Sequence, residues 1–244
     1  MNKRTTVHIW QKHLDLLHED VSAAEALLSA EERERAKTLR CPKDRRRFVL
    51  RHAYLRVVTA RYLGQPPDRV SLETKPNEPP RIVSHATMAG WHLSLSSSED
   101  QTVVAVAWRR RVGIDIEKIR PDAEDISVAE SLFSQVERAD LEATPASQRQ
   151  HAFFRTWARK EAYAKAIGLG FSRDFTSFDV LASNSRAAMR DENLVNDRKA
   201  SKDDAPWLVK DVPTRHGFVL ACCAEGAGWS IAHFRDDDPA PRMS

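Results

Sequence analysis

Cysteine is scarce in this chain, which has three among 244 residues. Cys41 stands alone, and Cys222 and Cys223 are neighbours inside the apolar run GFVLACCAE. Neither arrangement has the spacing of a disulfide framework or of a cysteine metal site. The sequence therefore predicts a cytoplasmic protein whose cysteines stay reduced.

Long apolar runs are also missing. The stretch MNKRTTVHIWQK at the start holds no run that could serve as a signal peptide, and no segment approaches the length of a membrane span. Hydrophobic residues make up 41% of the chain, which is enough for the core of one large domain or two small ones. We expect a globular protein that does not bind membranes.

Acidic residues are nearly absent from one segment, between Arg33 and Arg61, although the net charge of the whole chain is only +3. Glu34 and Asp44 are its two acids. Its basic residues are Arg33, Arg35, Lys37, Arg40, Lys43, Arg45, Arg46, Arg47, Arg51, Arg56 and Arg61. The cluster favours binding of an anion. The alternative is a solvated helical face whose arginine stems cover apolar surface.

Periodicity predicts helices from about residue 22, over 44–63, from about 127 and over 147–167. Strands are expected at WHLSLS, TVVAVAW, VGIDIE, SFDVLA, APWLVKDV, HGFVLACCAE and GWSIAHF, with a long loop or hairpin insertion over residues 184–204. Because three arginines separate TVVAVAW from VGIDIE, we expect these two strands to pair antiparallel. Helices and strands come in clusters, so the fold class is α+β, and a structural duplication about Pro121 is a hypothesis.

Two carboxylates, Asp115 and Glu117, lie on one face of the strand VGIDIE. At a separation of about 6 Å they repel by roughly 3 kcal/mol at an effective dielectric constant near 20. A bound cation would offset this cost. The alternative is an edge strand with both acids in water.

A third carboxylate, Glu161, lies in the helix HAFFRTWARKEAYAKAIG, whose aromatic residues predict a packed helix. Glu161 and Lys165 have the spacing of an ordinary exposed ion pair. Together with the two strand carboxylates, however, Glu161 would complete an oxygen site for Mg²⁺, and Lys160 and Lys165 would suit phosphate groups beside it.

GIDIE at residues 113–117 and WARKEA at 157–162, followed by Lys165, resemble the paired signatures of the 4'-phosphopantetheinyl transferases, specifically the large surfactin-synthetase-activating type. Lys75-Pro76, WHLSLS and LFSQVERADL resemble further segments of that family, so the likeness covers most of the chain. The resemblance implies two similar halves related by a pseudo-twofold axis, each an antiparallel sheet packed with helices. Residues 1–108 would form the half beside the coenzyme A nucleotide, and residues 109–244 the metal-binding and catalytic half.

The resemblance also assigns the residues of the site. It makes Asp115, Glu117 and Glu161 the ligands of Mg²⁺, with Mn²⁺ as the other candidate, and it makes Glu161, Lys165 and Asp115 the catalytic residues. The attacking serine also needs a general base, and Glu161, directly or through a metal-bound water, is the candidate. The implied coenzyme A ligands are Arg35, Arg47, Lys75, Ser94, Lys160 and Lys165.

The implied reaction moves the phosphopantetheine arm of coenzyme A onto a serine of an acyl or peptidyl carrier protein and releases 3',5'-ADP. We expect a monomer that acts on a carrier protein of fatty acid, polyketide, nonribosomal peptide or lysine biosynthesis. Carrier docking is expected after Pro121, where Phe133 would meet a carrier helix.

Leu95 stands where the family usually has a histidine, which removes one phosphate contact. His92, on the same side of the strand as Ser94, is a candidate substitute, although a structural histidine is the other reading. One alternative function is therefore a degenerate transferase that binds coenzyme A or carrier without catalysis. A second is a nucleic-acid-binding protein, which the small net charge and the lack of aromatic residues among the arginines disfavour.

Overall fold

A computed structural model describes residues 5–15, 20–73, 80–83, 90–120, 128–168, 174–180, 192–197, 205–235 and 238. The fold is α+β, with helices packed on antiparallel sheets, as the clustered pattern predicted. Among the described residues, no helix is both long and apolar enough to cross a membrane. The three cysteines are free, and Cys222 and Cys223 are buried in the core.

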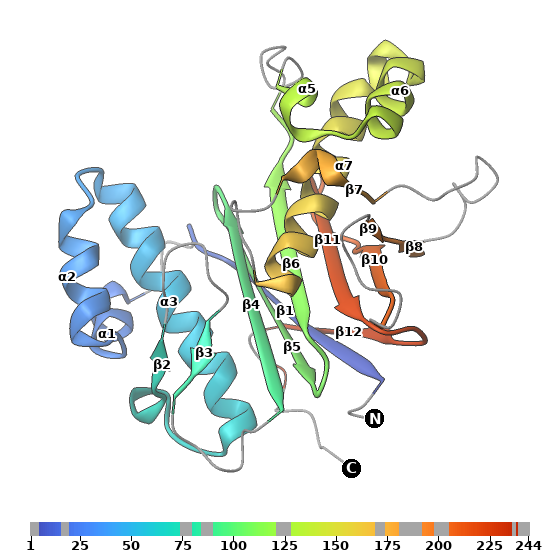
Figure 1. Cartoon of the computed structure of the whole chain (residues 1–244). Helices are drawn as coiled ribbons and strands as arrows, with labels where there is room; N and C mark the ends of the chain where they lie inside the picture. Colours follow the sequence, from blue (N-terminus) through green and yellow to red (C-terminus); the bar gives the residue numbers. More distant parts are fainter. Residues whose placement is uncertain are drawn as a thin grey trace.

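The first sheet has the strand order β12-β1-β5-β4. It is built from β1 (Thr6–His13), β4 (Trp91–Ser98), β5 (Gln101–Trp108) and, parallel to β1, β12 (Ser230–Phe234). Helices α1 (Val21–Ala26), α2 (Ala30–Thr38) and α3 (Pro42–Leu63) lie beside this sheet in Figure 1. A 3-10 turn (Pro67–Arg69) and the short pair β2 (Leu72–Glu73) and β3 (Arg81–Ile82) follow α3.

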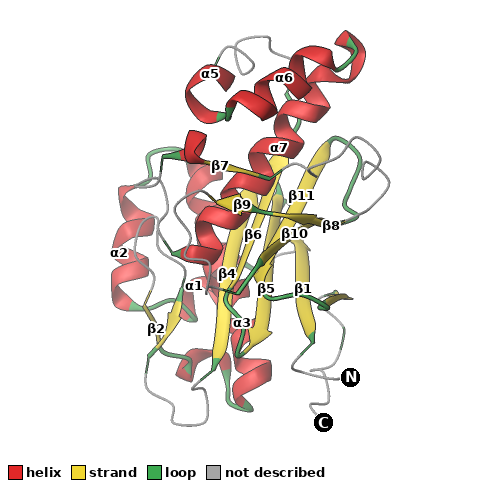
Figure 2. Cartoon of the chain, turned by 45° about the vertical axis from the view of Figure 1, so that its right-hand side comes forward, coloured by secondary structure: helices red, strands yellow, loops and turns green. Residues whose placement is uncertain are grey.

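The second sheet has the order β6-β11-β10-β8. Its strands are β6 (Val112–Lys118), β11 (Phe218–Glu225), β10 (Trp207–Asp211) and β8 (Glu192–Leu194). Its helices are α5 (Ala129–Leu132), α6 (Gln135–Ala143) and α7 (Ala146–Ile167), and Figure 2 shows α7 running along the sheet. A 3-10 turn (Phe175–Ser177) precedes β7 (Phe178–Asp179), which pairs with β9 (Asn196–Asp197).

The same helical unit occurs twice, about 104 residues apart. In each half a nine-residue helix with a capping box, α2 or α6, precedes a 22-residue helix, α3 or α7, that ends at a left-handed glycine. The capping glutamate is buried and pairs with a cation eight residues before that glycine. The two sets are Glu32, Arg56 and Gly64 in the first half, and Glu137, Lys160 and Gly168 in the second.

The strands repeat as well, because β1 pairs with β5 as β6 pairs with β11. Trp10 and Asp115 each face the fourth residue of an eight-residue partner strand, Val104 and Ala221 respectively. This repeat supports the hypothesis of a duplication. One strand crosses between the halves, since β12, near the C-terminal end, joins the first sheet.

The expected antiparallel pairing of TVVAVAW with VGIDIE is wrong. Both edges of β5 are taken by β1 and β4, and β6 pairs with β11 instead. On its other side β6 meets the serine side chains of β4, so the two sheets join without a backbone ladder at this seam.

Several element boundaries also differ from the sequence prediction. The helix expected from residue 22 onward is two helices, because Ser29 caps α2 with a reciprocal Glu32 bond. Helices α3 and α7 match the predicted spans within two residues. Most of residues 184–204 lie outside the described part of the chain. Within this range the structure describes residues 192–197, which contain β8 and β9.

Gly113 lets helix α7 lie directly on strand β6. A Cβ atom at this position would overlap the backbone oxygen of Ala162 and would come within 2.5 Å of the nitrogen of Ala166. Only glycine therefore permits this approach. The close contact brings Asp115, two residues along β6, next to α7.

Candidate active site

Alternate serines of β4 form the seam with β6. The hydroxyl oxygens of Ser94, Ser96 and Ser98 accept hydrogen bonds from the backbone N–H groups of Ile114, Ile116 and Lys118, at 3.0, 3.3 and 3.0 Å. These bonds satisfy N–H groups of a strand edge that has no backbone partner there. They also fix the register between β4 and the acidic residues of β6.

Asp115 is buried at the centre of this seam, with 3% of its surface exposed. Its Oδ1 accepts hydrogen bonds from Lys165 Nζ at 2.6 Å and from Ser96 Oγ at 2.8 Å, while its buried Oδ2 has no hydrogen-bond partner among the described residues. Burial raises the pKa of Asp115, and the neighbouring Lys165 and Ser96 oppose this rise.

Glu117 is held at both carboxylate oxygens. Ser98 Oγ donates to Oε2 at 3.0 Å, and the indole Nε1 of Trp157 donates to Oε1 at 3.2 Å. Burial and then the charge of Asp115 raise the pKa of Glu117 to about 7, although the hydrogen bonds from Ser98 and Trp157 lower it.

Glu161 reaches the cluster from α7, with 6% of its surface exposed. Its Oε1 is buried and has no hydrogen-bond partner in the part of the chain that the structure describes. Burial and then Asp115 raise its pKa to about 7, with a smaller addition from Glu117 and an opposing effect from Lys165. The three carboxylates thus repel one another, and Lys165 alone does not compensate their charge.

The chemistry of this donor set fits a divalent cation such as Mg²⁺. Carboxylate oxygens are hard ligands, and the mutual rise of the pKa values shows that negative charge is in excess at the cluster. Among the described residues, Asp115 and Glu161 each keep a buried oxygen without a hydrogen-bond partner. Within the described ranges, however, no group of three or more His, Cys, Asp or Glu side chains is arranged to hold one ion in common. Both oxygens of Glu117 are engaged, so its role as the third ligand stays a prediction.

A cleft of about 380 Å³ opens beside Lys165 and carries further positive charge. Arg81 of β3 and Arg111 also line it, together with His92 of β4. Burial lowers the pKa of His92, with Glu225 opposing and Arg111 adding to the effect, so His92 is neutral near pH 7. The cleft is suited to an anionic ligand that reaches the carboxylate cluster at Lys165.

Comparison with known proteins decides the family. The model of the 4'-phosphopantetheinyl transferase superfamily matches residues 111–223. The 4'-phosphopantetheinyl transferase HetI of Nostoc sp. is 34% identical over 224 residues, which are 91% of this chain and 89% of HetI. This chain belongs to the 4'-phosphopantetheinyl transferase superfamily.

Other transferases of the family are similar over most of their length. The 4'-phosphopantetheinyl transferase psf-1 of Bacillus pumilus is 32% identical over a stretch that covers 80% of this chain and 78% of psf-1. A 4'-phosphopantetheinyl transferase of Bacillus subtilis is 32% identical over 82% of this chain and 83% of its own. The chain is accordingly an enzyme of this class.

A solved holo-(acyl-carrier-protein) synthase from Bacillus anthracis, in complex with CoA (3',5'-ADP), is similar in structure over 48% of this chain and 96% of the synthase chain. Its sequence identity is 19% and its TM-score is 0.38, which is too low to bear on the ligand.

Asp115 and Lys165 of the transferase lie near enough to Glu117 and Glu161 to shift the pKa of these two carboxyl groups, but Lys160 does not join them. Lys160 is fully buried, and its Nζ donates to Glu137 Oε2 at 2.6 Å and to the carbonyl oxygen of Phe178 at 2.7 Å. Its expected contact with coenzyme A therefore finds no support in this geometry.

The other expected coenzyme A ligands have varied surroundings. Arg47 donates to Asp15 at 2.6 and 3.0 Å and to Glu99 at 3.1 Å. Ser94 is buried in the seam, and Arg35 lies exposed near the ring of Phe48. Lys75 lies outside the described residues.

Sequence reasoning missed the roles of Ser96, Ser98 and Trp157 in orienting the carboxylates. The alternating serines of WHLSLSSS were the available signal, since they place every second hydroxyl on one face of a strand. The expected carrier contact through Phe133 is wrong. Phe133 is fully buried and lies 5.1 Å from Phe153, ring centre to ring centre.

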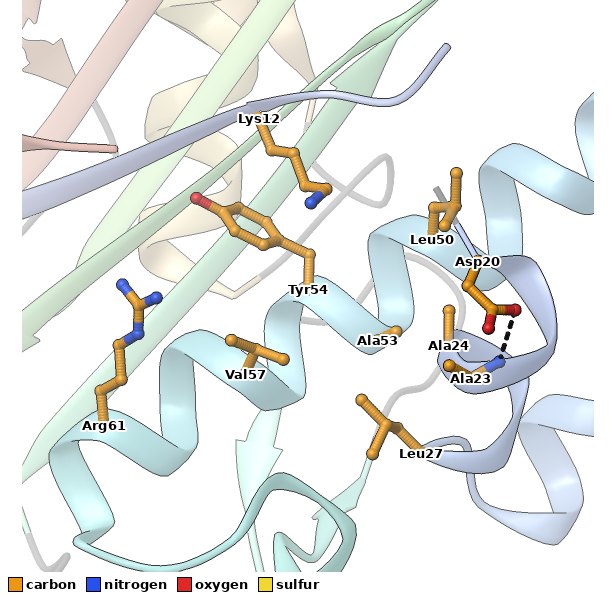
Figure 3. A pocket seen from close by; sticks show the side chains of 10 residues that line it. All are labelled: Lys12, Asp20, Ala23, Ala24, Leu27, Leu50, Ala53, Tyr54, Val57 and Arg61. Carbon is orange, nitrogen blue, oxygen red and sulfur yellow. Dashed lines mark hydrogen bonds between the residues drawn. The ribbon is translucent and has the colours of Figure 1, made fainter. Parts of the chain in front are cut away.

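The first half has a cavity of about 520 Å³ in the corresponding place, between β1, α1 and α3 (Figure 3). The repeat aligns Asp115, Glu117, Glu161 and Lys165 of the second half with four residues of the first half. In the same order, these are Trp10, Lys12, Val57 and Arg61. Three of the four line this cavity, and none of the four is acidic. At these corresponding positions, therefore, the second half carries the acidic cluster and the first half does not.

Proposed function

We propose that this transferase moves the 4'-phosphopantetheine arm of coenzyme A to a serine of an acyl or peptidyl carrier protein, with Mg²⁺ or Mn²⁺ as cofactor and 3',5'-ADP as product. The observation that carries the proposal is the pair Lys165–Asp115, which joins a cationic cleft to buried carboxylate oxygens that have no hydrogen-bond partner within the described ranges. Residues 1–108 would serve the nucleotide side and residues 109–244 the metal and the reaction. We keep a cytoplasmic monomer as part of the proposal.

The residues of the chain would act mainly by positioning and by charge neutralisation. When bound, the divalent cation would neutralise the diphosphate and hold it for in-line displacement. Asp115, Glu161 and Glu117 would hold that cation, and the Lys165 ammonium group would contact the phosphate oxygens.

The proton of the attacking serine needs an acceptor. We assign Glu161, whose buried Oε1 makes no hydrogen bond to any described residue. The serine oxygen would form a bond to the phosphorus attached to pantetheine, and the bond from that phosphorus to the oxygen of 3',5'-ADP would break. The proton would pass from the serine to Glu161, and 3',5'-ADP would leave as the anion.

Carrier docking would use the surface of α5 and α6, where two apolar side chains are exposed. Val128 is 44% exposed and Val136 is 56% exposed. These side chains, rather than the buried Phe133, can meet an apolar face of a carrier helix.

Mass spectrometry of an apo carrier protein tests the function. After incubation with coenzyme A, Mg²⁺ and the full chain, the carrier should gain the mass of phosphopantetheine. The matched reaction with Glu161→Gln should give little product, because glutamine cannot accept the proton. Unchanged carrier mass with the wild-type chain, for carriers of every class tried, would contradict the proposal.

A further inference from the structure

The cavity of the first half, between β1, α1 and α3, is lined mainly by small apolar side chains. Its volume of about 520 Å³ is that of a small-molecule site, and such sites are concave and apolar with a few polar groups. Figure 3 shows the apolar side chains on two neighbouring helices. From α1 they are Ala23, Ala24 and Leu27, and from α3 they are Leu50, Ala53 and Val57.

Comparison of the two halves explains why this space is open. In the second half the Trp157 indole reaches from α7 to Glu117 on β6, where it donates a hydrogen bond at 3.2 Å. The repeat aligns these two residues with Ala53 on α3 and Lys12 on β1. Because an alanine side chain ends at its Cβ atom, Ala53 cannot fill the space that an indole would take. Ala53 and Lys12 line the cavity instead.

Two cations belong to the lining, and aromatic rings hold both of them in place. The Lys12 ammonium nitrogen lies 5.5 Å from the ring centre of Tyr54, and the guanidinium carbon of Arg61 lies 4.6 Å from a ring centre of Trp10. Arg61 also donates to the carbonyl oxygen of Asp238 at 2.9 Å. In Figure 3 Lys12 descends from β1 toward the ring of Tyr54, and Arg61 points toward the same ring from α3.

Asp20 is the acid among the described residues of the lining. Its Oδ1 caps α1 by accepting hydrogen bonds from the backbone N–H groups of Ser22 at 2.9 Å and of Ala23 at 3.1 Å. The lining therefore carries two positive charges and one negative charge beside an apolar floor. This balance suits an anion of single charge, whereas a dianion would be repelled by Asp20.

Ammonium and guanidinium groups are good partners of carboxylates, and an apolar floor gains from covering by a hydrocarbon chain. We propose that this cavity binds a carboxylate with an apolar chain, such as a medium-chain fatty acid. The chain lies between α1 and α3, and the carboxylate group lies at Lys12 and Arg61. The cavity shares no lining residue with the cleft beside Lys165, so this site is distinct from the one proposed for the transfer reaction.

Calorimetric titration of the full chain with three probes tests the site. Octanoate has both the chain and the charge, octanamide has the chain alone, and acetate has the charge alone. Octanoate should bind with one molecule per chain. Octanamide and acetate should each bind at least about tenfold more weakly, because each lacks one of the two interactions. Saturating coenzyme A with Mg²⁺ should leave the affinity for octanoate unchanged.

Two variants place octanoate in the cavity. Ala53→Trp supplies the side chain that the second half has at the corresponding position, and it should abolish binding by filling the space. Lys12→Met keeps an unbranched chain and removes the charge, so it should weaken octanoate about tenfold and leave octanamide unchanged. Arg69→Met is the matched control, because it removes an exposed cation of the same half outside the cavity. Thermal unfolding shows whether each variant folds, and Lys12→Met carries the test if Ala53→Trp does not.

Four results would overturn the inference. The wild-type chain could fail to bind octanoate, or it could bind octanamide equally well, which would leave no role for the cations. Unchanged octanoate affinity in Lys12→Met would place the carboxylate elsewhere. Displacement of octanoate by coenzyme A would make the cavity part of the coenzyme A site.

Discussion

Ser98 contributes to the site through one hydroxyl with two hydrogen bonds. It accepts from the Lys118 N–H and donates to Glu117 Oε2, so it fixes both the strand and the carboxylate. In Ser98→Ala the carboxylate loses one of its two orienting contacts. We expect the Mg²⁺ concentration for half-maximal transfer to rise several-fold, with a smaller change in the rate at saturating Mg²⁺.

Ser97→Ala is the matched control for this prediction. The Ser97 hydroxyl bonds Thr102 instead of the acidic cluster, so its loss should leave the metal requirement unchanged. Direct binding of Mn²⁺, followed by its electron paramagnetic resonance signal, gives a readout other than activity. Equal Mn²⁺ affinity in Ser98→Ala and the wild type would contradict the positioning role.

Helical geometry explains which residues of α7 reach the carboxylate cluster. Trp157, Glu161 and Lys165 are four residues apart and share one helix face, and the structure places all three at the carboxylate cluster. Lys160 is one residue from Glu161, which turns it about 100° around the helix and into the core. The resemblance assigned both Lys160 and Glu161 to the site, but the helical period points their side chains in different directions.

At the scale of elements, a buried ion pair joins each short helix to its long helix. Lys160→Met should lower the free energy of unfolding by about 3–5 kcal/mol, because it leaves the Glu137 carboxylate buried without its cation. Urea unfolding measures this change. Lys37→Met, which breaks an exposed pair with Glu34, should change stability by less than about 1 kcal/mol. Loss of activity in Lys160→Met with unchanged stability would instead favour a role at the coenzyme A phosphates.

The corresponding pair in the first half predicts a pH dependence. Burial raises the pKa of Glu32, but hydrogen bonds from His52 and Ser29 and the charge of Arg56 outweigh it and lower the pKa to about 2. A depressed pKa stabilises the fold above the unfolded value near 4.5, and this stabilisation is lost as pH falls toward 2. The loss should be on the order of 3 kcal/mol. Glu32→Gln should remove this part of the slope in urea unfolding between pH 5 and 2, and an unchanged slope would contradict the assignment.

Local patterns predicted the long helices and most strands because helical and strand periods are visible in a single segment. The pairing of β5 with β6 was mispredicted because partner choice depends on distant strands. The short connection between β5 and β6 suggested that these two strands pair. Instead β6 pairs with β11, which lies about 100 residues further along the chain. The serine seam was likewise invisible, since it needs the register of two separate sheets.

At the scale of the whole molecule, one fold unit is used twice, and among the described residues at corresponding positions only the second copy carries the acidic cluster. The duplication was suggested by the order of helices and strands alone, because the corresponding residues differ. Arg56 replaces Lys160 in the buried pair, and Trp10 stands in the place of Asp115. The first half keeps the packing of the unit and, through Ser94, Ser96 and Ser98, completes the site of the second.

The central claim is that Asp115, with Glu161 and Glu117, holds one divalent cation beside Lys165. Calorimetric titration of Mg²⁺ into the chain saturated with coenzyme A tests it most directly. The account predicts one ion per wild-type chain and at least a tenfold weaker affinity in Asp115→Asn, with unfolding stability equal or higher because a buried charge is removed. Equal Mg²⁺ affinity in the wild type and Asp115→Asn would contradict it.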